Sequence, residues 1–250
     1  MQFAERYVLS IKSECLNHFV ILGETMLQRI IENFNCHYED DYIAWLWVWE
    51  GRQSWFELAF SRDGIQWQRI LPGRMAFPLG EPGSWDSEMV SLMAPVVYDD
   101  KIRIYYGGWN HPYTSEAMKR VEEGWIENGQ RRQRAIGLAT LRLDGFVSLA
   151  AGEERGIVTT KPLHLPGGSL FVNADVQGEL RAEILDARSQ TLPGFSLNDC
   201  VPIRSDGLRH EIQWQSDSHL DTLEGRIARV RFELVKGELY AFWFVSGSMQ

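Results

Sequence analysis

Residues 58–64, Leu-Ala-Phe-Ser-Arg-Asp-Gly, match residues 138–145, Leu-Ala-Thr-Leu-Arg-Leu-Asp-Gly, with one residue inserted. In each copy an apolar run rich in strand-forming residues leads into Asp-Gly, a pair that tolerates the positive φ of a tight turn. A repeated strand followed by a tight turn is typical of four-stranded antiparallel units, from which β-propeller blades are built. The match therefore predicts two blade-like units, about 80 residues apart along the chain.

The segments that flank each copy also indicate strands. Tyr42–Trp49 is aromatic and β-branched, and Lys101–Tyr106 precedes Gly107 and Gly108. We expect Phe146–Leu149 to return as a strand after the turn at Asp144 and Gly145. Trp45, Trp47 and Trp49 alternate, so all three face one side of their strand. The interpretation favoured for them is blade core, and the alternative is a platform for sugars.

The last third of the chain has a different pattern. Polar and apolar residues alternate, which is typical of strands with one wet face and one buried face, as in a β-sandwich. Gln177-Gly178 predicts a hairpin turn, and Lys236-Gly237 predicts a second turn. The four predicted strands are Leu170–Asp175, Glu179–Leu185, Arg229–Leu234 and Leu239–Phe244.

The start of the chain shows helical spacing instead, because apolar residues between Phe19 and Phe34 recur every three or four positions. The predicted fold is all-β: a partial β-propeller of about two blades, a C-terminal β-sandwich and a short N-terminal helical segment. The predicted boundaries are 1–40, 41–155 and 156–250. Within the long connection 110–134, residues 115–123 predict a short helix. The basic residues Arg131, Arg132 and Arg134 follow three glutamates, which predicts a solvated loop.

Composition excludes several functions. A net charge of −9 disfavours nucleic-acid partners. The three cysteines and six histidines have no disulfide or metal-site spacing, so neither a metal nor another cofactor is expected. No apolar run approaches the ~20 residues that cross a membrane, and no signal peptide is recognised. The location is therefore open, with the cytoplasm as the default and secreted relatives as the alternative.

Asp86 and Glu88 are the first candidate site, within Gly83-Ser-Trp-Asp-Ser-Glu88. On a strand, residues two apart share a face, and two carboxylates on one face can divide acid and base roles. Glycoside hydrolysis needs such a pair, so these residues are the candidate catalytic groups. The alternatives are contacts to a substrate or a turn, and simple capping or surface placement.

The second candidate is Gly107-Gly108-Trp109-Asn110-His111. Glycines at a strand end allow close approach of a ligand or of another backbone. Trp109, together with Trp85, is a candidate for stacking on a sugar ring, and Asn110 and His111 are candidates for bonding to its hydroxyls. The alternative is a bulge that carries a packed tryptophan.

Four sequence segments resemble those of five-bladed propeller glycosidases of glycoside hydrolase families 32 and 43. These are residues 58–67, 83–87, 104–109 and 136–146. Segments 159–162, 172–175 and 193–197 resemble the C-terminal sandwich of the same proteins. The resemblance implies the fold, a carbohydrate partner and hydrolysis without a cofactor.

This chain has neither the Asn-Asp-Pro nor the Arg-Asp-Pro motif that carries two catalytic aspartates in those enzymes. The matched portion corresponds to the last two blades, which implies a truncated form that lacks the main catalytic blades. Whether the chain is an enzyme is left open. The alternatives are a non-catalytic carbohydrate-binding module and a structural module that associates with itself through an open blade edge.

Overall fold

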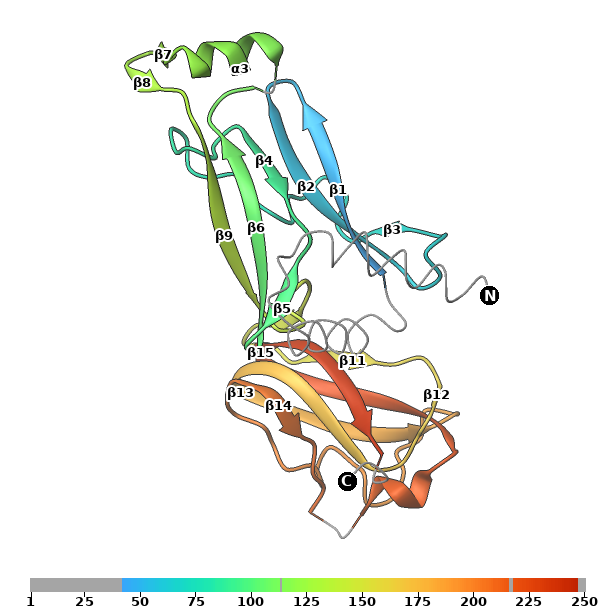
Figure 1. The fold of residues 1–250 in the computed structure, drawn as a ribbon. Coiled ribbons are helices and arrows are strands. Elements are labelled where there is room, and N and C mark those ends of the chain that lie inside the picture. Colours follow the sequence, from blue (N-terminus) through green and yellow to red (C-terminus); the bar gives the residue numbers. More distant parts are fainter. Residues whose placement is uncertain (1–41, 113, 216–217, 247–250) are drawn as a thin grey trace, which may run out of the picture. The chain divides into compact units, whose positions relative to one another are not determined.

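The computed structural model describes residues 42–112, 114–215 and 218–246. Strands are the main regular structure of these residues and helix is scarce, so the all-β prediction is confirmed (Figure 1). The predicted helix between residues 19 and 34 lies outside the described residues. The chain divides into two compact units, the first ending at Leu141 and the second starting at Arg142.

The first unit begins with an antiparallel group of three strands, in which β2 lies between β1 and β3. Strands β1 and β2 pair over their whole length, from Tyr42 opposite Ser61 to Glu50 opposite Gln53. The predicted turn at Asp63 and Gly64 is present: Gly64 has φ +68°, and the Asp63 side chain accepts hydrogen bonds from the backbone N–H groups of Ile65 and Gln66. The bounds are β1 Tyr42–Glu50, β2 Gln53–Ser61 and β3 Gln68–Arg69.

A second antiparallel group is centred on β6, which pairs with β4, β5 and β9. One parallel contact, Ser54 opposite Met89, joins it to the first group. The sequence repeat thus falls on β2 and β9, one strand in each group of this seven-stranded sheet. The bounds are β4 Met89–Leu92, β5 Val96–Tyr98, β6 Lys101–Trp109 and β9 Arg134–Arg142.

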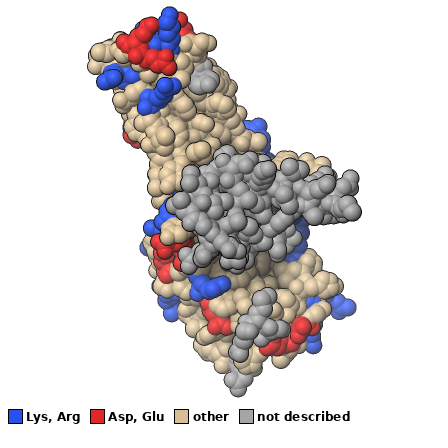
Figure 2. Space-filling view, viewed as in Figure 1, with Lys and Arg blue, Asp and Glu red and all other residues tan. Residues whose placement is uncertain are grey.

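The long connection between β6 and β9 carries the predicted short helix, α3 (Ser115–Glu122). Thr114 caps it, since its hydroxyl oxygen accepts the Ala117 N–H at 3.1 Å. A short hairpin of β7 (Ile126–Glu127) and β8 (Gln130–Arg131) follows. Acidic and basic side chains are interspersed around α3 (Figure 2), so no field of one sign forms there.

The second unit is one sheet built around two long antiparallel strands, β13 and β15. Three short strands, β10, β11 and β12, pair in succession along the outer side of β15, and β14 pairs with β13. The bounds are β10 Leu149–Ala151, β11 Gly156–Thr159, β12 Leu163–His164, β13 Ser169–Asp186, β14 Gly207–Glu211 and β15 Ile227–Val245.

The predicted hairpin at Gln177-Gly178 and the predicted turn at Lys236-Gly237 are wrong. Both pairs lie inside the long strands, where the register shifts between Val176 and Glu179, and Lys236 has φ +52°. The two irregularities lie opposite each other and form bulges, which bend and twist a sheet without ending it. A glycine beside a polar residue suits a bulge as well as a turn, so local sequence does not separate them.

The bend folds the sheet over, so that one face of it surrounds a single hydrophobic core, as in a sandwich. Leu170, Val172, Ala174 and Val176 precede the bulge in β13, and they share the buried face with Leu180, Ala182 and Ile184 beyond it. The bulge therefore preserves the alternation, and the buried residues of β15, such as Phe232, complete the core.

Strand β10 changes one expectation about connectivity. The predicted return of Phe146–Leu149 onto 136–141 does not occur, because Leu149 pairs with Leu239 of β15. Residues 149–151 therefore belong to the sheet of the second unit. The second unit consequently starts earlier than the predicted boundary at residue 156.

The first unit contains a buried ion pair that makes its stability depend on pH. Glu57 of β2 is 2% exposed, and its carboxylate accepts from Arg69 Nε at 2.7 Å and from Gly73 N at 3.0 Å. The hydrogen bond from Arg69 is the main reason that the pKa of Glu57 lies below its ordinary 4.5.

A carboxyl group with a lowered folded-state pKa stabilises the fold above its unfolded pKa, and loses that effect as the pH falls through the folded value. We therefore expect urea unfolding between pH 7 and pH 3 to show stability falling below about pH 4.5. In the Glu57→Gln variant, the free energy of unfolding should fall less steeply over this acid range. An unchanged slope in the variant would show that other titrating groups dominate the loss of stability at low pH.

Candidate functional site

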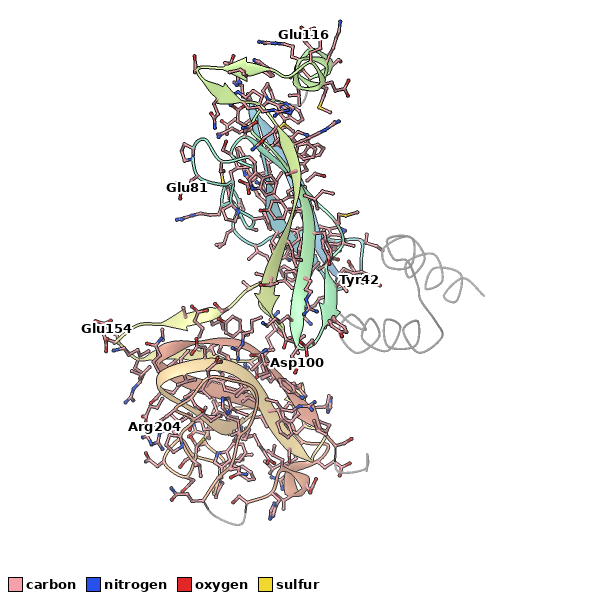
Figure 3. The ribbon with its side chains drawn as sticks, turned by 60° about the vertical axis from the view of Figure 1, so that its left-hand side comes forward. Tyr42, Glu81, Asp100, Glu116, Glu154 and Arg204 are labelled. Carbon is pink, nitrogen blue, oxygen red and sulfur yellow. The ribbon has the colours of Figure 1, made fainter. Side chains whose placement is uncertain are left out.

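The Trp85–Asp86 segment lies in a tight loop before β4 and not on a strand. Backbone bonds close the loop on itself, from Gly80 N to Asp86 O at 3.2 Å and from Ser84 N to Glu81 O at 2.8 Å. In Figure 3 the labelled Glu81 marks this loop, at its exposed side. The expectation that Asp86 and Glu88 share a strand face is therefore wrong, because the alternation of a strand does not apply to turn residues.

The Asp86 carboxylate accepts hydrogen bonds from two side-chain hydroxyl groups. Its Oδ1 accepts from the Ser84 hydroxyl at 2.7 Å, and its Oδ2 accepts from the Tyr106 hydroxyl at 2.9 Å. Burial, followed by the hydrogen bond and the charge of Asp86, raises the pKa of Tyr106 to about 12. Tyr106 therefore keeps its proton at neutral pH and fixes the direction in which the carboxylate points.

Trp85 lies beside Asp86 and packs on the same tyrosine. The rings of Trp85 and Tyr106 are stacked, with centroids 5.4 Å apart and planes 21° apart. Phe77 meets Tyr106 edge-on at 4.9 Å. We call Phe77, Trp85, Asp86 and Tyr106 the Asp86 cluster; its aromatic contacts fix the side chains without any help from a ligand.

Glycines make room for this cluster. A Cβ atom at Gly108 would lie closer than 3.0 Å to the Trp85 ring and to Asp86 Cβ, and one at Gly137 would come equally close to the Tyr106 ring. Real Cβ atoms essentially never approach so closely. Gly108 thus serves close approach, as its position at the end of β6 suggested, and Gly137 inside β9 does the same without having been predicted.

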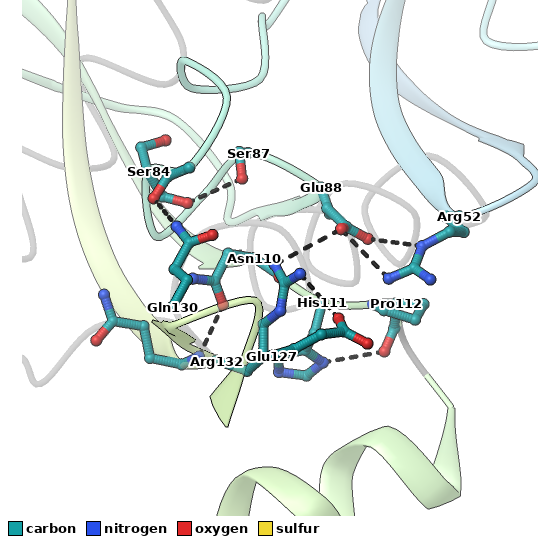
Figure 4. Close-up of polar contacts among 12 residues, drawn as sticks. Arg52, Ser84, Ser87, Glu88, Asn110, His111, Pro112, Glu127, Gln130 and Arg132 are labelled. Atoms are coloured by element: carbon teal, nitrogen blue, oxygen red, sulfur yellow. Dashed lines mark hydrogen bonds and ion pairs between the residues drawn. The ribbon is translucent and has the colours of Figure 1, made fainter. Parts of the chain in front are cut away.

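Glu88 belongs to a different network (Figure 4). Its carboxylate accepts from Arg52 Nε at 3.3 Å and pairs with Arg132 Nη1 at 3.8 Å. Arg132 also pairs with Glu127 at 2.8 Å and donates to the carbonyl oxygen of Asn110 at 2.6 Å. We call Arg52, Glu88, Glu127 and Arg132 the Glu88 network. Each of its carboxylates pairs with a guanidinium, whereas Arg132 Nε has no hydrogen-bond partner among the described residues.

Arg132 corrects the prediction of a solvated loop at residues 131–134. Its side chain is 11% exposed, because the segment runs directly into β9 beside Glu88. The sequence places the balancing glutamates nearby, but only the fold brings Glu88, 44 residues earlier, against this arginine.

Trp109, Asn110 and His111 lie apart from Trp85. A Cβ at Gly107 would meet the Trp109 ring, whereas one at Gly108 would meet the Trp85 ring. Neighbouring strand residues point to opposite faces, so the two tryptophans lie on opposite faces of β6. One sugar ring therefore cannot contact both of them at once.

Asn110 and His111 are buried, and both bond to the backbone. The Asn110 amide donates to Arg131 O at 3.1 Å and accepts from Gln133 N at 2.7 Å, which holds the start of β9. His111 Nδ1 lies 3.0 Å from Pro112 O, and a carbonyl oxygen can only accept, so this nitrogen carries the proton. Its Nε2 has no hydrogen-bond partner among the described residues.

The six predicted site residues fall into two groups. Trp85 lies beside Asp86, whereas Glu88 lies near Trp109 and Asn110, because its N–H donates to Trp109 O at 3.0 Å and Arg132 contacts both Glu88 and the Asn110 carbonyl oxygen. Tyr106 was not singled out, although it stands in the string 104–109 that carries the family resemblance. Arg52 and Arg132 were missed as well, and Arg52 has no sequence signal because it lies in an ordinary hairpin turn. Within the described ranges, no cluster of metal-ligating side chains occurs. No helix of these residues is long and apolar enough to span a membrane.

Removing the Arg132 charge should destabilise the first unit. Arg132→Met leaves Glu88 and Glu127 without their shared guanidinium, and we expect a loss of about 2 kcal/mol for this partly buried pair of contacts. Arg134→Met is the matched control, since Arg134 pairs with Glu122 at 3.8 Å and both side chains are well exposed. Urea unfolding measures both variants. Equal losses of stability in the two variants would show that the partly buried ion pairs of Arg132 stabilise the unit no more than an exposed ion pair does.

Comparisons with known proteins add little to this geometry. A scan against family models and a search of curated proteins found no match. Among solved structures, the chain is similar to a glycoside hydrolase family 43 arabinoxylan arabinofuranohydrolase from Bacillus subtilis, in complex with cellotetraose. The identity is 9% and the TM-score 0.24, over 84% of this chain and 52% of that chain. The chain thus spans about half of that enzyme, and so low a similarity supports at most a distant likeness of fold.

Proposed function

We propose that this chain is a carbohydrate-active protein of glycoside hydrolase type that binds sugar at Trp85 and Asp86. The observation that carries the proposal is the Asp86 cluster, in which an indole ring and a carboxylate lie side by side and are both fixed by Tyr106. Aromatic faces with a few oriented polar groups are what sugar-binding sites need. The resemblance of residues 83–87 and 104–109 to glycosidase strings points to the same residues.

The Asp86 carboxylate retains capacity for a ligand. Each of its oxygens accepts one hydrogen bond within the loop, and a carboxylate offers about four acceptor positions in total. Two sugar hydroxyls can therefore donate to Asp86 while its bonds to Ser84 and Tyr106 are kept. Because these bonds exist before binding, the ligand pays little to order the side chain.

The finer form of the proposal assigns hydrolysis to Asp86 and Glu88. One carboxyl would protonate the leaving oxygen while the other acts as base or nucleophile. A screen for hydrolysis of oligosaccharides tests this assignment, and Asp86→Asn and Glu88→Gln should each lower any activity at least ~100-fold. Activity that survives both substitutions would remove these residues from the reaction.

A specific observation favours binding without hydrolysis. The Glu88 carboxylate is engaged by Arg52 and Arg132, so Asp86 is the carboxylate of the pair that is free of ion pairs in the described structure. A thermal-shift screen of the purified chain against neutral oligosaccharides separates the two forms, together with product analysis. Binding without products supports a binding module. Absence of both would overturn the proposal.

Tyr106→Phe tests how Asp86 is positioned. The variant keeps the ring that stacks on Trp85 and removes only the hydroxyl that bonds Asp86. We expect the affinity for a sugar found in the screen to fall about tenfold, the equivalent of one hydrogen bond of about 1.4 kcal/mol. Tyr105→Phe is the control, because Tyr105 is exposed on the neighbouring position of β6. Equal affinities of the two variants would show that Tyr106 does not act through Asp86.

Self-association is the alternative role. The exposed strand β1, with two half-exposed tryptophans, is the observation that favours it.

A further inference from the structure

Strand β1 forms the edge of the first sheet. All nine of its residues pair with β2 on one side, and no other described strand pairs with its second side. An edge presents unpaired N–H and C=O groups and is normally protected by short length, charge or proline. Its sequence, Tyr-Ile-Ala-Trp-Leu-Trp-Val-Trp-Glu, contains no proline or lysine, and its one charge is at the end. Within residues 42–112, 114–215 and 218–246, nothing protects this edge from pairing.

The tryptophans of β1 were expected to be core, and the structure corrects this for two of them. Trp47 is 50% exposed and Trp49 is 48% exposed. Their rings are ordered all the same: Trp47 lies parallel to Phe56 at 6.1 Å, and its centroid is 5.7 Å from that of Trp49. Exposed, ordered aromatic rings beside an open strand edge are typical of an interface, since they bury large area at low entropic cost.

We infer that the occupant of this edge is a second copy of the chain, paired β1 to β1 in antiparallel orientation. The spacing Trp-x-Trp-x-Trp is symmetric about Trp47. A two-fold axis through this point and perpendicular to the sheet places Trp47 opposite its equivalent, and Trp45 opposite Trp49 in both directions. Opposed residues of antiparallel strands share a face, so the tryptophans of both copies form one ladder.

The charges at the proposed interface and its area are consistent with this pairing. In the proposed register Glu50 lies opposite Ala44, so no like charges meet at the interface. The two half-exposed indoles offer roughly 200 Å² per copy, and the main-chain pairing adds to this. That total is at the small end of specific interfaces, so the dimer should dissociate on dilution. Because each copy carries a net charge of −9, added salt should favour the dimer.

Light scattering after size-exclusion chromatography tests the inference on the full chain. We expect the mass to rise from 28.8 kDa toward twice that value as concentration increases, and to rise at lower concentration in 0.5 M salt than in ~0.05 M salt. Trp49→Lys and Trp47→Lys should remain monomeric over the same range. A wild-type mass that stays monomeric throughout would overturn the proposal.

Trp67→Lys is the matched control, because Trp67 is 44% exposed but lies outside β1. It should dimerise as the wild type does. If it becomes monomeric as well, or if Trp49→Lys still dimerises, the β1 interface is wrong. Circular dichroism checks that each variant is folded. The readout is mass, so it is independent of whether the Asp86 cluster binds sugar.

A cross-link provides a second measurement that leaves the tryptophans intact. In the proposed register residue 46 lies opposite residue 48, at a separation that a disulfide can bridge. Leu46→Cys with Val48→Cys should give a covalent dimer on oxidation. Ala44→Cys with Leu46→Cys, which are not opposed, and the wild type, which carries the native cysteines, should not. Equal cross-linking of the two variants would contradict the register.

Discussion

The Gly108→Ala variant is expected to lose about 2–3 kcal/mol of unfolding free energy and to lose sugar binding, because the added methyl group overpacks a filled site. The methyl would lie closer than 3.0 Å to the Trp85 ring and to Asp86 Cβ. Neither neighbour is the free end of a flexible chain, since Trp85 is stacked on Tyr106 and Asp86 is bonded from two sides. The loop must therefore move off β6, and the Asp86 cluster moves with it.

Urea unfolding followed by tryptophan fluorescence measures this effect, since eight of the ten tryptophans precede residue 142. Gly152→Ala is the control, because a Cβ at Gly152 has no atom within 4 Å and its φ is not positive. If Gly108→Ala were as stable as Gly152→Ala, the Trp85 loop would not pack on β6 as described.

Gly178→Ala should destabilise the second unit by about 3 kcal/mol, which is the range of severe overpacking in a core. Its Cβ would lie closer than 3.0 Å to the carbonyl oxygen of Val235 on the paired strand. A backbone oxygen inside a strand ladder cannot move without breaking the register between β13 and β15. The single core of the folded sheet depends on that register.

Far-UV circular dichroism during thermal unfolding measures the loss, because it reports on the strands of both units. The same Gly152→Ala variant is the control, and it lies in the second unit near β10 and β11. A hairpin at Gln177-Gly178, as the sequence suggested, would place residue 178 in an open turn and tolerate alanine far better. A loss below about 0.5 kcal/mol would therefore contradict the bulge.

The fold class was predictable because it rests on local patterns that repeat. The strand and Asp-Gly turn at residues 58–64 and 138–145 recur as β2 and β9, and the alternation after residue 169 recurs as one buried face. Gln177-Gly178 was misread because a bulge and a hairpin need similar residues. What separates them is the partner strand β15, about 60 residues later, which continues past the bulge.

The candidate site was predictable only in part, for the same reason. Trp85 and Asp86 were found because adjacent residues stay together in any conformation. Glu88 was grouped with them on the assumption of a strand, but the loop turns Asp86 toward Tyr106 and leaves Glu88 beside Arg52 and Arg132. Long-range ion pairs between single charged residues leave no pattern in one sequence.

Calorimetric titration tests most directly whether Trp85 and Asp86 together bind carbohydrate. The titrant is the oligosaccharide that gives the largest thermal shift with the wild-type chain. We expect saturable binding to the wild type and to Trp67→Ala, and at least a tenfold loss of affinity in Trp85→Ala and in Asp86→Asn. Equal affinity in all four proteins would contradict this expectation.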